Sequence, residues 1–410
     1  MIDFYEDTAL TPMKAAALSG YIDWSSQPSI FKHYPEFLYR YKYGENQLLQ
    51  MVELCRIITS RSVIGSKPYY QLNTPSAGNL HPMELYVQIR GIKGIISGIY
   101  HVDAGADEIV LIREIDSDGL EQNLGLSRRH DGMLFVLSCV PFRAEWKYAK
   151  RSSRYCYLDA GHQIAAVQAA AKLYGQETTI VSDFDLLEFN RCMGFKEEEF
   201  TCAVLACANP APKSVQPLKQ KLMHVSPTDY NESLGNSISL IAKGAVFKSD
   251  PFSLACGISR EDILKRRSAR VFESSGMQEE SLEYFMNLLH KATYPLECFN
   301  IVLKEGLYKA GIYFSGVMIQ EGLFADEICS LLVNQSFVKN ADILTVMTSK
   351  HFSANKLMLS GSFTHNLYLE ASAKNIGCSG IGAFYDKKLQ DFLGTQNYIL
   401  YVSALGKERI

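Results

Sequence analysis

The spacing of hydrophobic residues along the chain has two periods, which together predict a protein of helices and strands. Apolar residues at every second position of residues 85–89 indicate a strand, and the apolar run 133–140 indicates a buried strand. Helical spacing covers residues 47–58. The alanine-rich stretch 155–174 predicts a long helix that ends at Gly175, because glycine suits the position after a helix.

Other segments complete this pattern in the first half of the chain. Residues 98–112 predict a further pair of strands, residues 184–193 a short helix and residues 201–208 a closing strand. The first 50 residues are rich in Tyr, Phe and Pro. We interpret them as an extended arm that wraps a surface rather than as a helix.

The second half of the chain repeats this plan, with three sequence matches in the same order. The matched segments are Pro82-x-Glu84 with Gly98-Ile99-Tyr100 against Pro295-x-Glu297 with Gly311-Ile312-Tyr313, residues 169–175 against 371–377, and residues 204–210 against 401–407. We therefore predict an α+β fold of two tandem domains, each a mixed antiparallel sheet flanked by helices. The first domain spans residues 1–210, a connecting segment 211–257, and the second domain 258–410.

A compact polar loop precedes the strand at residues 85–89. It consists of Pro75, Ser76, Ala77, Gly78 and Asn79. Gly78 allows a sharp turn or a close approach to a flat ligand, and Ser76 and Asn79 can donate and accept hydrogen bonds, as a heteroaromatic ring edge requires. The same residue types are typical of an ordinary turn before a strand, so the loop alone leaves both interpretations open.

The second domain carries cations and glycines that the first domain lacks. These residues are Arg266, Arg267, Ser268 and Arg270 at its opening, Gly380, Ile381 and Gly382 in a predicted turn after its long helix, and Lys407 and Arg409 at its end. Arginines in so short a run can clamp a phosphate group, and a bare glycine backbone can lie against a planar cofactor. Taken alone, the arginine run also fits a solvated helix end.

The two domains are therefore complementary. The first keeps the polar loop and lacks the cations, whereas the second keeps the cations and lacks the loop. A single site shared by the two domains explains this pattern, and two independent sites do not.

Composition narrows the class of protein. With 410 residues and a net charge of −3, the chain has no excess of positive charge for nucleic acid or anionic membranes. Its ten cysteines include no C-x-x-C pair and no cluster with metal-ligand spacing. The sequence has no signal-peptide core and no run of roughly 20 apolar residues. We expect a cytoplasmic protein that binds no metal.

The motifs together resemble the flavin nitroreductase superfamily. Its members are normally dimers that bind FMN between subunits, with an R-R-S-x-R opening, a G-x-G turn and a terminal Lys or Arg from one subunit and a P-S-x-x-N loop from the other. Here the first set matches the cations and glycines of the second domain, and the second matches residues 75–79. The resemblance implies FMN as cofactor and an intramolecular pseudo-dimer, with any further homo-oligomer left open.

The first domain resembles a narrower branch, the SagB/ThcOx-type dehydrogenases that oxidise azolines to azoles in modified peptides. The matching segments are residues 31–35 (FKHYP), 76–82, 98–101 (GIYH), 147–155 and 159–162 (DAGH). Ala149 stands where the branch usually has glycine, and Ser153 where it has an aromatic residue.

This branch implies a function and a catalytic pair. Lys147 and Tyr148 would be the acid/base element, and the substrate a ring in a small molecule or modified peptide, with other peptide-modifying enzymes as partners. A lysine partly removed from water can serve as a base, with the tyrosine hydroxyl orienting or relaying; a surface Lys147 beside a packing Tyr148 is the competing interpretation. Two alternatives remain at this stage: a nitro- or quinone reductase that uses NAD(P)H, and a non-catalytic flavoprotein or scaffold.

Overall fold

The computed structural model describes residues 4–18, 20, 22–65, 67–227, 244–250, 252, 257–291 and 295–409. The chain divides into two compact units. One comprises Asp23–Asp250 and is called the central unit here; the other comprises Met1–Ile22 together with Pro251–Ile410 and is called the C-terminal unit. The first 22 residues, assigned above to the first domain, thus belong to the unit that contains the end of the chain.

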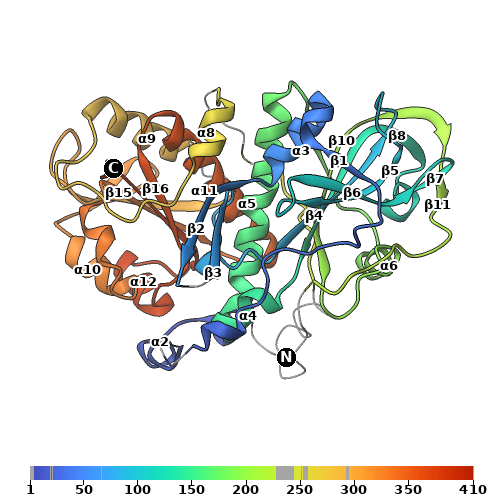
Figure 1. Cartoon of the computed structure of the whole chain (residues 1–410). Coiled ribbons are helices and arrows are strands. Elements are labelled where there is room, and N and C mark those ends of the chain that lie inside the picture. The colour runs from blue at the N-terminus through green and yellow to red at the C-terminus, as the bar shows by residue number, and fades with distance from the viewer. Residues whose placement is uncertain are drawn as a thin grey trace. The chain divides into compact units, whose positions relative to one another are not determined.

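The central unit is built on a seven-stranded antiparallel sheet in the order β1-β6-β5-β4-β8-β10-β9 (Figure 1). Its strands are β1 (Arg40–Lys42), β4 (Met83–Arg90), β5 (Gly98–Asp103), β6 (Glu108–Glu114), β8 (Arg128–Cys139), β9 (Thr179–Val181) and β10 (Phe200–Ser214). A separate hairpin, β2 (Ile58–Ile64) and β3 (Lys67–Leu72), leads into the polar loop, and β7 (Asp118–Gly119) pairs with β11 (Gln216–Pro217).

Helices cover the sheet of the central unit. They are α3 (Gln47–Cys55), α4 (Phe142–Tyr148), α5 (Ser152–Leu173) and α6 (Leu186–Cys192). The Asn46 side chain caps α3 by accepting a hydrogen bond from the Leu48 N–H. Helix α5 packs against α3 and against strands β4, β8 and β10, while Phe189 of α6 joins a buried apolar cluster with Val136 and Val204 of the sheet.

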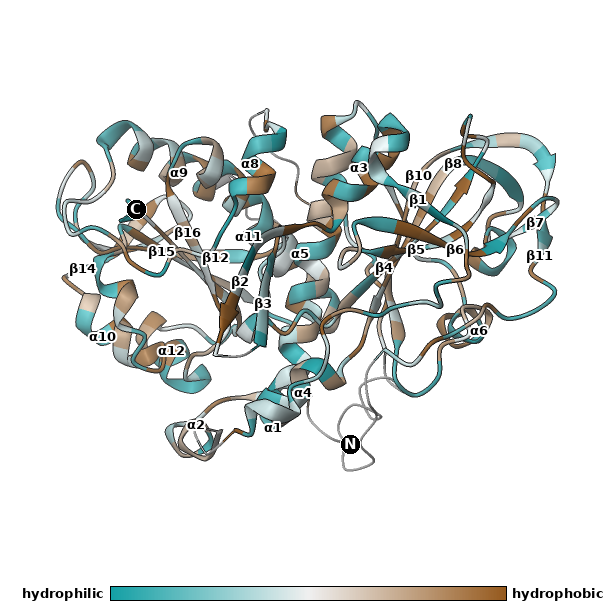
Figure 2. Ribbon diagram, in the orientation of Figure 1, coloured by the Kyte–Doolittle hydropathy of each residue, from teal (hydrophilic) through white to brown (hydrophobic). Residues whose placement is uncertain are grey.

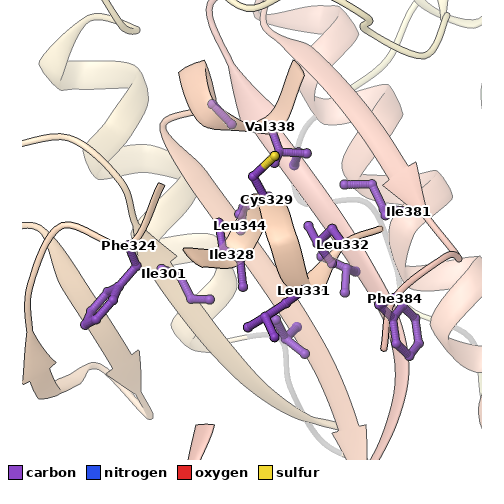
Figure 3. Close-up of a cluster of buried hydrophobic side chains, with 14 of the residues drawn as sticks. Ile301, Phe324, Ile328, Cys329, Leu331, Leu332, Val338, Leu344, Ile381 and Phe384 are labelled. Carbon is purple, nitrogen blue, oxygen red and sulfur yellow. The ribbon is translucent and has the colours of Figure 1, made fainter. Parts of the chain in front are cut away.

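The C-terminal unit has a six-stranded antiparallel sheet in the order β14-β13-β12-β15-β17-β16. Its strands are β12 (Glu297–Val302), β13 (Gly311–Phe314), β14 (Val317–Glu321), β15 (Ile343–Ser349), β16 (Gly377–Ile381) and β17 (Tyr398–Gly406). Its helices are α1 (Phe4–Thr8), α2 (Pro12–Leu18), α8 (Arg260–Lys265), α9 (Glu279–Lys291), α10 (Ala325–Leu331), α11 (Ala354–Ala373) and α12 (Asp386–Leu393). Figure 3 shows part of its core, where Ile328 and Leu331 of α10, with Leu332 just after it, meet Ile301 and Leu344 of the sheet.

The two sheets confirm the predicted tandem repeat. Their six corresponding strands have the same order, and the register is also the same, since Val87 lies opposite Tyr100 just as Asn300 lies opposite Tyr313. Both units are thus mixed α and β with antiparallel sheets flanked by helices, as the fold class predicted. Figure 2 shows hydrophobic residues concentrated in strands such as β5 and β6, whereas the helices carry both hydrophobic and hydrophilic residues.

The units differ in how their opening segments are used. In the central unit, β1 pairs with the edge strand β6, and Arg40 lies opposite Val110. In the C-terminal unit, the segment after α8 lies instead along β16, where Ser268 forms a parallel bridge with Cys378. Arg40 therefore lies at the β6 edge of the central sheet, whereas the arginines of the second domain lie at the β16 edge of their own sheet. These two edges are not equivalent positions in the repeat.

Some expectations from the sequence were wrong. The first 50 residues were predicted as an extended arm, but α1 and α2 are helices. Gly380 and Ile381 were predicted in a turn, but they lie in strand β16. The connecting segment 211–257 lies partly outside the described residues, and its first residues continue strand β10.

Candidate functional site

The polar loop forms a short 3-10 turn, η3 (Ala77–Asn79), between β3 and β4. Gly78 has φ of +63°, a conformation that L side chains rarely adopt. A Cβ atom at Gly78 would also come within 2.6 Å of the Tyr148 hydroxyl oxygen. Glycine is thus required here for both backbone shape and space, and the loop lies directly against Tyr148.

Hydrogen bonds within the loop use much of its polar capacity. The Asn79 Nδ2 donates to the Tyr70 carbonyl at 2.6 Å, and the Asn79 Oδ1 lies 2.9 Å from the His81 Nε2. The Ser76 Oγ accepts from the His81 N–H at 2.9 Å. Ser76 and Asn79 therefore fix the shape of the loop, in which Pro75 and Ala77 are half-exposed and Gly78 is exposed.

Asp159 anchors the loop from helix α5, and the sequence analysis did not include it among the site residues. Its buried carboxyl accepts hydrogen bonds from the Ser76 hydroxyl and the Ala77 N–H. Burial raises the pKa of Asp159 to about 8, although these hydrogen bonds favour the ionised form. An acid within an alanine-rich, buried helix is the sequence signal that could have identified it.

Lys147 and Tyr148 occupy the last turn of α4. The Tyr148 ring packs edge-on against Tyr155 of α5, with 4.7 Å between ring centroids. Among the described residues, no carboxylate or hydrogen-bond acceptor pairs with the half-buried Lys147 ammonium group. Burial lowers the pKa of Lys147 below its usual value. A half-buried amine without an acidic partner is the state that a general base requires.

The chain ends α4 at Ala149 by an unusual backbone conformation. Ala149 has φ of 44° and ψ of −131°, a combination that glycine adopts readily and alanine does not. The local backbone therefore keeps the shape that glycine would favour and holds Lys147 and Tyr148 just before the bend.

Two other segments singled out in the sequence, residues 31–35 and 98–101, contribute buried ion pairs to the central unit. Lys32 is fully buried, and its Nζ lies 2.6 Å from the Glu199 carboxylate. Glu84 lies between the Arg143 guanidinium at 2.6 Å and the His101 ring at 3.0 Å. The contacts of Lys32 and His101 therefore explain their presence through the fold rather than through catalysis.

The cations of the C-terminal unit come together through main-chain hydrogen bonds. The Ala269 N–H donates to the Cys378 carbonyl at 2.8 Å, which fixes the arginine segment beside β16. The Arg409 N–H donates to the Val271 carbonyl at 3.1 Å, so the end of the chain after β17 lies beside the same segment. Residues 266–270, Gly380 and residues 407–409 thus lie along one edge of the sheet.

The five cations differ in burial. Arg266 is buried, with its guanidinium 5.2 Å from the centroid of the Tyr368 ring. Arg267 pairs with Glu408 at 3.1 Å, and Lys407 pairs with Glu273 at 2.7 Å. Arg270 and Arg409 are exposed. In the described part of the chain Arg270 and Arg409 form no ion pair, so this edge of the sheet keeps an excess of positive charge.

The glycine strand β16 is held by aromatic residues. A Cβ atom at Gly380 would overlap the Tyr401 hydroxyl, so no larger residue fits without movement. The Tyr368 hydroxyl accepts a hydrogen bond from the Gly380 N–H at 2.6 Å and lies 2.9 Å from the Ser268 hydroxyl. On the same helix as Tyr368, burial and the charge of Arg266 lower the pKa of His365 to about 3. Ile381 is buried and Gly382 half-buried, at the end of this strand.

The predicted site residues thus form two groups. Residues 75–79, Lys147 and Tyr148 lie together in the central unit, while residues 266–270, 380–382, Lys407 and Arg409 lie in the C-terminal unit. In the described part of the chain, no group of three His, Cys, Asp or Glu residues could hold a metal ion. Nor does any described helix have the length and apolarity to cross a membrane.

Comparisons with known proteins show what the chain is similar to. The family model described as the nitroreductase family matches residues 263–407, which include the opening arginines and Lys407. A nitroreductase candidate of Methanocaldococcus jannaschii is 26% identical over 182 residues, which cover 37% of this chain and 92% of that protein. The crystal structure of a nitroreductase candidate from Anabaena variabilis has a TM-score of 0.80 at 20% identity and covers 99% of both chains.

These similarities show the fold of the whole chain. The likeness to the Anabaena variabilis structure extends over both units and shows a shared fold. The family match covers residues 263–407, which lie within the C-terminal unit.

Proposed function

We propose that the chain is an FMN-dependent dehydrogenase that oxidises an azoline or a similar ring in a peptide-derived substrate. The observation that carries the proposal is the cationic edge of the C-terminal unit. There, the two carboxylates that pair with Arg267 and Lys407 leave an excess of positive charge beside the glycine strand β16. This edge lies in the part of the chain that matches the nitroreductase family.

The donor set at this edge fits the FMN phosphate. A phosphate group carries up to two negative charges and accepts hydrogen bonds from several guanidinium and ammonium groups. The exposed side chains of Arg267, Arg270, Lys407 and Arg409 would hold it, while the buried Arg266 supports the strand beside them. The backbone of residues 380–382 and of the loop at residues 75–79 would lie against the ring system.

The two groups of residues are complementary rather than duplicated, and we propose that together they make one site per chain. In that arrangement the tandem domains act as an intramolecular pseudo-dimer. Each unit contributes what the other lacks: the loop and the Lys147–Tyr148 pair from one, the cations from the other.

The chemistry divides between cofactor and protein. When bound, FMN would accept the two electrons and the hydrogen that leave one ring carbon of the azoline. Lys147 removes a proton from the neighbouring ring carbon, and the two losses together make the ring aromatic. The half-buried amine suits this role because burial lowers its pKa. Tyr148, whose hydroxyl lies against Gly78, orients the lysine or relays its proton.

The test is whether such a ring reduces the bound flavin. Mixed without oxygen with a synthetic peptide that contains one thiazoline, the purified chain is expected to lose its oxidised flavin absorbance and yield one thiazole per flavin. A chain whose flavin is reduced by NADPH and not by the thiazoline would instead be a nitro- or quinone reductase. A flavin that neither compound reduces would indicate a non-catalytic flavoprotein.

Arg409→Ala tests the phosphate end of the site. Loss of one charge-assisted hydrogen bond is expected to weaken FMN binding by roughly tenfold to a hundredfold. Because the Arg409 side chain is exposed, the melting temperature of the flavin-free chain should not change. Titration with FMN measures the affinity and should give one site per chain. Lys387→Ala is the matched control, since Lys387 is an exposed cation of the same unit that pairs with Asp391; equal FMN affinity in both variants would refute the assignment.

A further inference from the structure

Both tryptophans of the chain lie beside Lys147. Trp24 belongs to the short 3-10 turn η1 (Trp24–Ser26), and Trp146 to helix α4. Their rings form an edge-to-face pair with 5.5 Å between centroids. Trp24 is 51% exposed, although a large aromatic residue is usually more buried than this. Its position therefore calls for an explanation other than core packing.

Hydrogen bonds fix the turn that carries Trp24. The Asp23 carboxylate caps it by accepting from the Ser25 N–H at 2.9 Å and from the Ser25 hydroxyl at 2.6 Å. From strand β3, the Lys67 Nζ donates to the carbonyls of Trp24 at 2.7 Å and Ser25 at 3.0 Å. From α4, the Trp146 Nε1 donates to the Ser26 hydroxyl at 2.9 Å. Groups from several parts of the central unit thus hold an exposed aromatic ring in one place.

That place is against the amine of Lys147. The Lys147 Nζ lies 4.9 Å from the centroid of the Trp24 ring and 5.4 Å from that of Tyr148. An aromatic face has two opposite effects on an ammonium group: its quadrupole attracts the charge, and its bulk excludes water that would solvate the charge. Burial lowers the pKa of Lys147 below its usual value, which is the direction that exclusion of water produces.

The charged groups on the elements that meet here do not oppose this effect. On the side of Trp24, Asp23 is engaged with Ser25 and Lys67 with main-chain carbonyls. On the side of α4, Glu145 is buried two residues before Lys147, and Lys150 follows in the next turn. None of these groups forms an ion pair with Lys147 in the described part of the chain.

We propose that Trp24 is a positioning residue for Lys147: its ring fixes the amine and keeps water from it, so that the neutral base is available nearer to neutral pH. This inference rests on the proposed function in one respect, which is that Lys147 acts as the base in the reaction. The effect on the protonation of Lys147 is a property of the central unit itself and is measured without any substrate.

The experiment is competitive labelling of lysines with trace acetic anhydride, which reacts with neutral amines, over a range of pH on the flavin-loaded chain. Mass spectrometry of the Lys147 peptide gives its titration curve, and the exposed Lys387 is the internal reference. In the parent, Lys147 should titrate at lower pH than Lys387. In Trp24→Ala, its curve should move up towards that of Lys387, with the neutral fraction at fixed pH falling about tenfold for each unit.

Trp24→Phe is the conservative variant and should keep most of the parent's behaviour, because phenylalanine still covers the amine. Fluorescence of Trp146, the remaining tryptophan in either variant, and the melting temperature check that the turn is still folded. A Lys147 curve in Trp24→Ala that coincides with the parent's curve would overturn the proposal, and so would equal shifts in both variants.

The outcome is separable from that of the proposed function. If the labelling curve shifts as expected but Lys147→Ala reduces its flavin with the thiazoline peptide at the parent's rate, Trp24 does control the amine and the catalytic role of Lys147 is wrong. If Trp24 controls the amine and Lys147 is also the base, the acid limb of the pH profile for flavin reduction should move in Trp24→Ala by the same amount as the labelling curve.

Discussion

Lys147→Ala is expected to slow flavin reduction by the thiazoline peptide by roughly a hundredfold or more, the usual scale for losing a positioned base. The physical reason is that no other amine in the described part of the chain combines partial burial with the absence of an acidic partner beside Tyr148. Flavin content and melting temperature should stay unchanged, because Lys147 forms no hydrogen bond or ion pair there that holds the fold. Stopped-flow absorbance in a single turnover measures the rate.

The controls for this prediction separate proton transfer from electron transfer. Reduction by dithionite removes no substrate proton and should be equal in the parent and the variant. Lys93→Ala removes an exposed lysine of the same unit and should keep the parent's rate. In the parent, the rate should rise with pH as Lys147 loses its proton, and because burial lowers this pKa the rise should occur below the pH of an ordinary lysine. A Lys147→Ala variant with the parent's rate and pH profile would exclude Lys147 as the base.

Lys32→Met is expected to lower the free energy of unfolding by about 3–5 kcal/mol, the usual cost of removing one partner of a buried ion pair. Its partner Glu199 is fully buried and also accepts hydrogen bonds from the Tyr86 hydroxyl at 3.0 Å and the Ser138 hydroxyl at 2.5 Å. Burial alone would raise the pKa of Glu199, but Lys32 and His224 outweigh it and lower the pKa to about 2. Without Lys32, a carboxylate is left in the core with too little compensation. Urea unfolding measures the loss.

A double variant and the pH dependence identify the cause of that loss. Adding Glu199→Gln to Lys32→Met removes the uncompensated charge and should recover part of the stability. In the parent, the ionised Glu199 contributes to the free energy of unfolding at pH values above the pKa that it has in the unfolded chain. This contribution is lost as the pH falls towards 2. In Lys32→Met the trend should reverse, with the deficit shrinking as acid neutralises Glu199. Lys387→Met, at an exposed pair, should cost about 1 kcal/mol or less; a similar small loss for Lys32→Met would contradict the prediction.

Much of the fold could be predicted from the sequence because its signals are local and repeated. The apolar alternation before Ile89 and the alanine-rich run of α5 each fix one element by their own spacing, and both elements are present. The repeat was recognisable because the same residue types recur in order at matching strand positions. Sheet order and register then followed the repeat, as the equivalent pairs Val87–Tyr100 and Asn300–Tyr313 show.

Predictions failed where an element depends on distant partners. Helices α1 and α2 have only five and seven residues, too short to be stable alone. They belong to the C-terminal unit, where the Tyr5 ring packs edge-on against Tyr398 and the Leu10 N–H donates to the Asp386 carboxylate. Likewise, Gly380 looks like a turn residue in the sequence, yet its N–H is bound by Tyr368 within a strand. The local sequence around these residues gives no indication of these contacts, because the partners lie elsewhere in the chain.

The sequence by itself determined which residue types stand at the proposed site: the polar loop at residues 75–79, the Lys147–Tyr148 pair and the cations that flank the second domain. Only the tertiary structure decided what each can do. It placed Asp159 under the loop, Trp24 against Lys147, and Lys32 against a carboxylate 167 residues away. The physical reason is that protonation, charge and hydrogen-bonding capacity depend on burial and on neighbouring groups, and the fold brings those neighbours from distant parts of the chain.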